Sequence, residues 1–124
     1  VQFDDTTQNN RMTVYASHHS LSSNIYASMF TGGVQKVSTS AGVKASAGVL
    51  QRVAFAYKAD NCQLAWNGSV SAVDSDTSGG LPTVTRMVIG GRQGSDEHLY
   101  GVLVRIKYWR RRFTSSELQQ YTTL

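Results

Sequence analysis

Residues 100–124, YGVLVRIKYWRRRFTSSELQQYTTL, decide the fold of this chain. Val102, Val104 and Ile106 occupy alternate positions, a period that places their side chains on one face of an extended strand. Three arginines follow the aromatic end of this pattern, and the period then changes. We therefore predict a long final strand from residue 99 onward, a basic corner, and one short helix.

The helix is predicted from residues around its first turn. Thr114 is a good N-cap, and Glu117 takes the third helical position of a capping box. Phe113 and Leu118 have the spacing of a hydrophobic staple, and Tyr121 lies one turn beyond Leu118. Because so short a helix is not stable alone in water, we expect it to cover a β-structure that the upstream chain forms.

The upstream chain alternates in hydropathy over many short segments. These predict strands at residues 1–4, 11–17, 24–31, 34–38, 49–59, 62–66, 69–73 and 83–89. Asn67-Gly68 is a strong signal for a type I′ hairpin, whereas the small residues of 39–47 indicate a loop or an irregular edge strand. About nine strands at such spacing are typical of a β-sandwich or jelly roll.

The composition agrees with a single all-β domain over residues 1–124. The chain is 40% hydrophobic and only 16% charged, and the remainder is rich in Ser, Thr, Asn, Gln and Gly. Cys62 is the single cysteine, which excludes an intrachain disulfide. No apolar run is long enough to predict a membrane span. Because the sequence opens at Val1, inside a strand-like pattern and without an initiator Met, we expect it to be the C-terminal part of a longer chain.

The net charge of +4 is concentrated near the C-terminus, at Lys107, Arg110, Arg111 and Arg112. Such a basic corner could bind phosphate, lipopolysaccharide or another acidic polymer. The favoured interpretation is a solvated strand end whose cations lie near other charges. A nucleic-acid surface would need a wider basic stripe with interleaved aromatics, so we expect no nucleic-acid partner.

Several segments, taken in order along the chain, match the motifs of known proteins. The first is the turn from Asp4 to Arg11, which reads DDTTQNNR. The others are residues 52–60 (RVAFAYKAD), Trp66-Asn67-Gly68, residues 76–79 (DTSG), Leu81-Pro82, Ile89-Gly90, Leu99-Tyr100-Gly101 and residues 111–119 (RRFTSSELQ).

Together these segments resemble one family, the concanavalin A-like (laminin G-like, jelly-roll) domains of bacteriophage and prophage tail fibres. The first turn is similar to the family's Asp-Gly-Thr-x-x-Asn-Arg turn, with Thr6 where glycine is usual. The resemblance implies a jelly-roll sandwich of two antiparallel sheets with one short C-terminal helix. It also implies that the family's first strand or two precede Val1, so that one sheet edge needs another chain or preceding residues.

The acidic residues argue against an enzyme. Glycosidases of this fold place two acids on one strand face, but Asp96 and Glu97 are adjacent and would point to opposite faces. The second glutamate, Glu117, belongs to the helix cap. A glycoside hydrolase is kept as a minor alternative. Asp74 and Asp76 could offer oxygens to Ca²⁺, but we favour an Asx-turn loop, and we expect no metal and no cofactor.

A sugar site needs an aromatic platform together with planar polar partners for the hydroxyls. We predict two candidate carbohydrate sites. The alternative is that Trp66 belongs to the core and that the loop is a plain solvated connection. The first site is the loop with Arg92, Gln93, Asp96, His98 and Tyr100, and the second is the hairpin tip with Trp66 and Asn67.

The resemblance and these residues together predict a non-catalytic, lectin-like module of a phage tail fibre or tailspike. Such a module would act outside the cell, as part of the virion, and would bind bacterial surface polysaccharide or lipopolysaccharide. The alternative is a structural module that caps or trimerises a fibre, with a homotrimer or other tail proteins as partners and no sugar bound.

Overall fold

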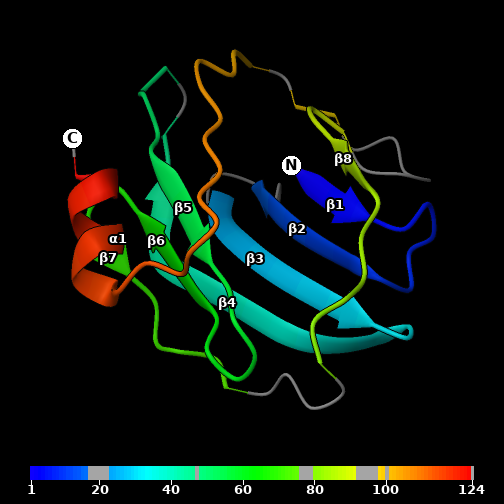
Figure 1. Cartoon of the computed structure of the whole chain (residues 1–124). Coiled ribbons are helices and arrows are strands. Elements are labelled where there is room, and N and C mark those ends of the chain that lie inside the picture. The colour runs from blue at the N-terminus through cyan, green and yellow to red at the C-terminus, as the bar shows by residue number, and fades with distance from the viewer. Residues whose placement is uncertain (17–22, 47, 76–79, 92–97, 100, 124) are drawn as a thin grey trace.

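The computed structural model describes residues 1–16, 23–46, 48–75, 80–91, 98–99 and 101–123, which form eight strands and one helix (Figure 1). Among these residues no helix has both the length and the hydropathy of a membrane span. One sheet has five strands in the order β4-β3-β2-β1-β8. The second has three, in the order β5-β6-β7, and all paired neighbours are antiparallel. The elements are β1 (Gln2–Asp4), β2 (Arg11–Ala16), β3 (Ser23–Thr31), β4 (Val34–Ala45), β5 (Val53–Ala56), β6 (Gln63–Trp66), β7 (Ser69–Val70), β8 (Arg86–Val88) and α1 (Ser115–Thr122).

The core lies between the two sheets, as strand alternation requires. Met12 and Met29 project from one sheet and pack with Val37 and Cys62, all 5% exposed or less. Leu64 and Trp66 of β6 pack on Ile25 and Ala27 of β3 in a second cluster. The predicted fold class is confirmed: the chain is an all-β sandwich of two antiparallel sheets with one short C-terminal helix.

Helix α1 forms a third layer on the far face of the three-stranded sheet. Phe113 and Leu118 are buried with Ala56 and Ala65 of that sheet, so the predicted staple residues both reach the core. The capping box is confirmed, because the Thr114 side chain accepts from the Glu117 N–H and the Glu117 carboxylate accepts from the Thr114 N–H. The rings of Phe113 and Tyr121 stack 4.9 Å apart, while Tyr121 keeps half of its surface exposed.

The predicted hairpin is also confirmed. Asn67 and Gly68 both have positive φ, 44° and 81°, as a type I′ turn requires. A side chain at residue 68 would also lie 3.2 Å from the Thr123 hydroxyl, so the turn needs glycine for both reasons. The hairpin is thereby held against the end of α1, where the Gly68 N–H donates to Thr122 Oγ1 at 3.1 Å.

Two strand predictions need correction. The long strand expected from residue 99 onward is not formed by the described residues: residues 101–110 are assigned to no strand and are all exposed. Alternation makes a segment compatible with a strand, but a strand also needs a neighbour for its backbone, and no described segment supplies one. The strand expected over 49–59 shortens to β5.

One of the two interpretations of residues 39–47 is confirmed. Residues 39–45 continue β4 at the edge of the sheet, and the pairing of β4 with β3 contains two register shifts, so this stretch is an irregular edge strand and not a loop.

Candidate functional site

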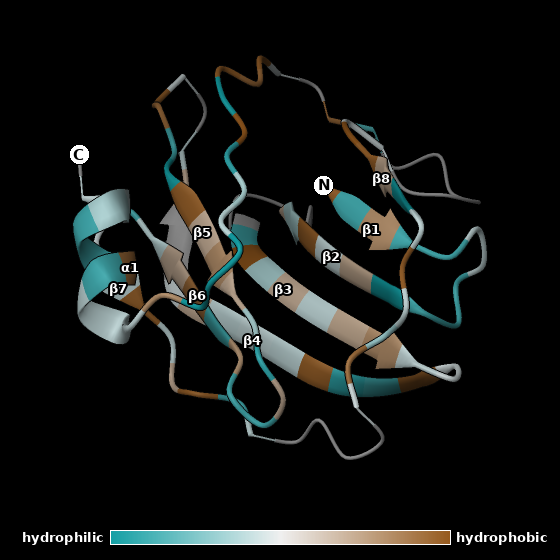
Figure 2. Ribbon diagram, viewed as in Figure 1, coloured by the Kyte–Doolittle hydropathy of each residue, from teal (hydrophilic) through white to brown (hydrophobic). Residues whose placement is uncertain are grey.

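The side of the five-stranded sheet that faces away from the second sheet carries a mixed polar and aromatic surface, here called the outer face. Met12 and Met29 point into the core, so their neighbours along β2 and β3 must point outward. Figure 2 shows the resulting bands of different hydropathy along these strands. The outer face consists of Gln2, Asp4, Arg11, Thr13, Tyr15, Tyr26, Ser28, Phe30 and Gln35.

A shallow depression of about 190 Å³ lies in the outer face. Residues of three adjacent strands line it, and the register explains their meeting: Arg11 lies opposite Phe30, and Phe30 lies opposite Gln35. Thr13 lies opposite Ser28 in the same way. The side chains that line the depression are Arg11, Thr13, Tyr15, Ser28, Phe30 and Gln35.

Aromatic rings and one cation make the walls of this depression. The Arg11 guanidinium carbon lies 3.7 Å from the centre of the Phe30 ring, a close cation–π contact. Tyr15 stacks on Tyr26 with ring centres 5.7 Å apart and an angle of 24°. Tyr15 keeps 43% of its surface exposed, so the stacked pair offers apolar ring surface beside polar groups.

Two buried oxygens beside the depression lack a hydrogen-bond partner. Gln2 Oε1 and Thr13 Oγ1 are both enclosed, and neither bonds to a described residue. Gln2 and Thr13 are direct cross-strand partners, so these oxygens belong to neighbouring side chains on one face. A buried polar atom without a partner costs about 1–3 kcal/mol, and native structures keep few of them. A ligand hydroxyl that donated to either oxygen would recover this free energy.

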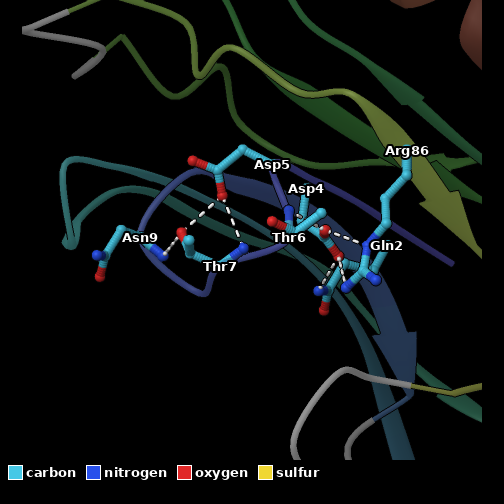
Figure 3. Close-up of polar contacts among 7 residues, drawn as sticks. All are labelled: Gln2, Asp4, Asp5, Thr6, Thr7, Asn9 and Arg86. Carbon is cyan, nitrogen blue, oxygen red and sulfur yellow. Dashed lines mark hydrogen bonds and ion pairs between the residues drawn. The ribbon is translucent and has the colours of Figure 1, made fainter.

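Asp4 holds Gln2 in place (Figure 3). The buried Asp4 carboxylate accepts from Gln2 Nε2 at 2.7 Å, from Arg86 Nε at 2.5 Å and from the Thr6 N–H at 2.8 Å. Burial by itself would raise the pKa of Asp4, but the hydrogen bonds from Arg86, Gln2 and Thr6 outweigh it and lower that pKa. Asp4 is therefore ionised and holds the amide nitrogen of Gln2 by a hydrogen bond. The amide oxygen of Gln2 has no hydrogen-bond partner among the described residues.

The turn after Asp4 is a network of local side-chain bonds. The Asp5 carboxylate accepts from the Thr7 N–H at 2.9 Å and from Asn10 Nδ2 at 2.8 Å, and the hydrogen bonds of Thr7 and Asn10 lower the pKa of Asp5. Thr6 has a φ of 75°, in the left-handed region that favours glycine. This is the position at which the family motif has glycine, and the backbone conformation explains why.

Most of the predicted loop site lies outside the described residues. Arg92, Gln93, Asp96 and Tyr100 belong to that part of the chain, and so does Glu97. His98 is described and exposed, and it forms an isolated antiparallel bridge with Gly91. The Leu99 N–H then donates to the Gly90 carbonyl at 2.8 Å, which closes the loop at its base.

The hairpin-tip site is occupied by internal contacts. Trp66 is fully buried in the core, as its alternative interpretation expected, so its indole faces are closed to a sugar ring. Trp66 Nε1 and Asn67 Nδ2 both donate to Gln51 Oε1, at 2.6 and 2.7 Å. Asn67 Oδ1 accepts from the Arg52 N–H at 2.8 Å. The amide of Asn67 thus fixes the hairpin to the segment before β5.

Acidic residues do not gather into a metal site among the described residues. Asp74 Oδ2 accepts from the Ser38 N–H at 3.2 Å, and the Asp74 backbone pairs with Cys62, so this aspartate connects β4 to the segment before β6. Asp76 lies outside the described residues. Cys62 is part of the core, and its burial raises the pKa of its thiol.

The basic corner is partly structural. Arg111 Nη2 forms an ion pair with Glu117 Oε1 at 2.6 Å, and Arg112 Nη2 donates to Gln63 Oε1 at 3.1 Å. Arg111 therefore ties the chain before α1 to the first turn of that helix, and Arg112 ties it to β6 of the three-stranded sheet. The expectation of cations near other charges describes Arg111, whereas Arg112 contacts a neutral amide.

The outer face was missed as a site, although its pattern is present in the sequence. Alternation along β2 and β3 separates Arg11, Thr13 and Tyr15 from the core residues between them. Polar and aromatic residues on the solvent side of two consecutive strands were the available signal. The pairing that brings them to Gln2 and Gln35 is not visible from local pattern.

Comparisons with known proteins found a solved structure with a similar fold. No family model matches the chain, and no curated protein is significantly similar to it. One solved structure, residues 221–444 of an S-layer domain-containing protein from Clostridium thermocellum, is similar with a TM-score of 0.52 and 19% identity. The match covers 99% of this chain and 61% of that chain, so this chain spans about three fifths of its neighbour's length. At this identity the similarity shows the fold alone.

Proposed function

We propose that this domain is a non-catalytic, lectin-like module that binds a glycan on its outer face. The observation that carries this proposal is a depression lined by Tyr15 and Thr13. Tyr15 stacks on Tyr26, and the buried oxygens Thr13 Oγ1 and, on the adjacent strand, Gln2 Oε1 have no hydrogen-bond partner among the described residues. Sugars present apolar C–H faces and many hydroxyl donors. The rings of Tyr15 and Tyr26 would pack against the C–H faces. Gln2 Oε1 and Thr13 Oγ1 would accept hydrogen bonds from the hydroxyls.

The resemblance of the sequence to phage tail-fibre domains supplies the setting of the proposal. In that setting the glycan is a polysaccharide or lipopolysaccharide of the bacterial surface, and the module helps the particle to adhere. The site takes no part in bond cleavage, because Asp4, the carboxylate of the outer face, is engaged by Arg86, Gln2 and Thr6.

The test is binding of defined surface oligosaccharides to the whole chain, by glycan array and calorimetry. Tyr15→Ala should weaken binding at least tenfold, and Thr13→Val should weaken it while the fold is kept. Arg92→Ala is the matched control, because it belongs to the predicted loop site instead. Loss of binding in Arg92→Ala with none in Tyr15→Ala would place the site in the loop. Absence of binding at millimolar oligosaccharide would contradict the lectin function.

A structural role in a fibre is the second candidate, and one observation favours it. Residues 101–108 expose several large apolar side chains, among them Val102 at 89% and Val104 at 75%. Contiguous exposed apolar surface of this kind is typical of a contact with another protein. Light scattering on the domain separates the candidates, since a module that trimerises a fibre should associate and a monomer at high concentration would contradict that role.

A further inference from the structure

The segment Val102–Trp109, here called the open segment, has no strand partner among the described residues. It belongs to no strand, and its backbone makes no hydrogen bond to another described residue. In Figure 1 it leads down to α1 past the end of β5. Unpaired N–H and C=O groups in an extended chain are a template for the addition of another strand.

Both ends of the open segment are held by the fold. Just before it, the Leu99 N–H donates to the Gly90 carbonyl. At its end, Trp109 packs against the rings of Phe113 and Tyr121, with ring centres 4.9 and 5.4 Å apart. The segment is thus kept in place between two anchors while its middle is open. The binding of a partner strand would therefore cost less conformational entropy than binding that first had to order this segment.

The side chains of the open segment define what would pair with it. Val102 and Val104 are 89% and 75% exposed, and Ile106 is 41% exposed. Arg105 and Lys107 alternate with them and are exposed as well. Arg105 forms no ion pair with another described residue, and Lys107 lies 5.9 Å from the ring of Trp109 in a weak cation–π contact. A complementary strand would alternate apolar and acidic residues.

A second copy of the same segment is a poor match in the register centred on Ile106, in which the apolar residues 104, 106 and 108 of the two copies pair with one another. An antiparallel pair of two copies centred on Ile106 would set Arg105 of one copy opposite Lys107 of the other. Like charges that lie directly opposite each other destabilise a strand pair. We propose that the open segment is a docking edge for a strand of another protein in which acidic and apolar residues alternate. This surface is separate from the outer face and does not depend on the glycan site.

The test uses the whole chain, labelled with ¹⁵N, and three capped synthetic peptides. The first alternates valine and glutamate, the second has lysine for each glutamate, and the third is the acidic peptide with alternate backbone nitrogens methylated. We expect the acidic peptide to shift the amides of residues 102–109 in a saturable way, at least tenfold more tightly than either of the others. Equal binding of the lysine or methylated peptide, shifts confined to other residues, or no binding at millimolar peptide would overturn the proposal.

Two variants sharpen this test. Val104→Pro removes one N–H from the open segment and should abolish peptide binding, while the melting temperature stays unchanged because that N–H bonds to no described residue. The double variant Arg105→Glu with Lys107→Glu should reverse the preference toward the lysine peptide, and it keeps the test valid if the proline variant fails to fold. Concentration-dependent association that Val104→Pro removes would identify a second copy as the occupant and would overturn the acidic partner.

Discussion

Asp4 and Arg86 are 82 residues apart in the sequence, yet the Arg86 side chain grips the Asp4 carboxylate through Nε at 2.5 Å and Nη2 at 3.3 Å. The two residues are also direct partners in the pairing of β1 with β8. Asp4 is fully buried, whereas the Arg86 side chain is 38% exposed. This pair fastens the edge strand β8 to the sheet and completes the polar network beneath the outer face.

Arg86→Ala should lower the free energy of unfolding by roughly 2–3 kcal/mol, because it leaves a buried carboxylate without its cation. Asp4→Asn in the same background should restore part of the loss, since the charge that needs a partner is gone. Chemical denaturation of both single variants and the double variant measures this coupling. Additive losses would mean that the two side chains do not stabilise each other.

The stability should fall in acid because the carboxyls of Asp4, Asp5 and Glu117 have lowered pKa values in the folded chain. The ion pair with Arg111, followed by the Thr114 N–H, lowers the pKa of Glu117 to about 2, and the pKa of Asp4 is lowered as well. The unfolded chain therefore binds more protons below roughly pH 4, so this stabilisation is complete above about pH 5 and is lost as the pH falls toward 2.

Thermal melts from pH 7 to pH 2 check this dependence. Glu117→Gln should flatten the curve at its lower end, where Glu117 takes up its proton. Asp4→Asn should flatten it separately, through the loss of the Arg86 pair. A melting temperature that stays constant over this range in the unmodified chain would contradict both assignments.

Thr6→Gly should stabilise the domain by about 1 kcal/mol, because a left-handed residue other than glycine carries a steric cost of that order. The Thr6 N–H, which donates to Asp4 Oδ1, is kept in this variant. Thr6→Ala is the matched control: it retains the strained φ of 75° and should bring no gain. Differential scanning calorimetry separates the two, and equal melting temperatures would refute strain at this turn.

Thr13→Val should raise stability by about 1 kcal/mol while it weakens glycan binding. The substitution replaces a buried hydroxyl that lacks a partner by a methyl group of similar size. Stability and binding then move in opposite directions, which is expected of a ligand-binding oxygen and not of a structural one. A destabilised Thr13→Val protein would show that the hydroxyl is already satisfied in the free domain.

Thr114→Ala should cost about 1 kcal/mol through the lost N-cap of α1. The Thr114 hydroxyl accepts from the Glu117 N–H, and Thr114→Ser, which keeps that acceptor, should cost little. The helix contacts the three-stranded sheet through Leu118, so the loss should appear in the global melting transition. An unchanged transition in Thr114→Ala would mean that the cap contributes nothing to the fold.

Local signals account for the parts of the structure that were predicted correctly. The capping box of Thr114 with Glu117 and the turn at Asn67-Gly68 involve residues within a few positions of each other, and both are present as expected. The alternation around Met12 and Met29 also predicted strands over residues 11–17 and 24–31, and both are present as β2 and β3. The strand predicted from residue 99 onward was wrong, because alternating hydropathy makes a segment compatible with a strand but does not show that another segment lies beside it to pair with its backbone.

The site depended on information that no local pattern holds. The sequence alone determined that the domain is a β-sandwich closed by a capped helix, since hydropathy periods and caps act over one turn or a few alternations. Only the tertiary structure decided that Gln2 lies beside Thr13, that Trp66 is internal, and that residues 102–109 pair with no other described segment. The reason is that strand pairing joins segments far apart in the chain, and the packing of the whole domain selects which backbone groups and side chains meet.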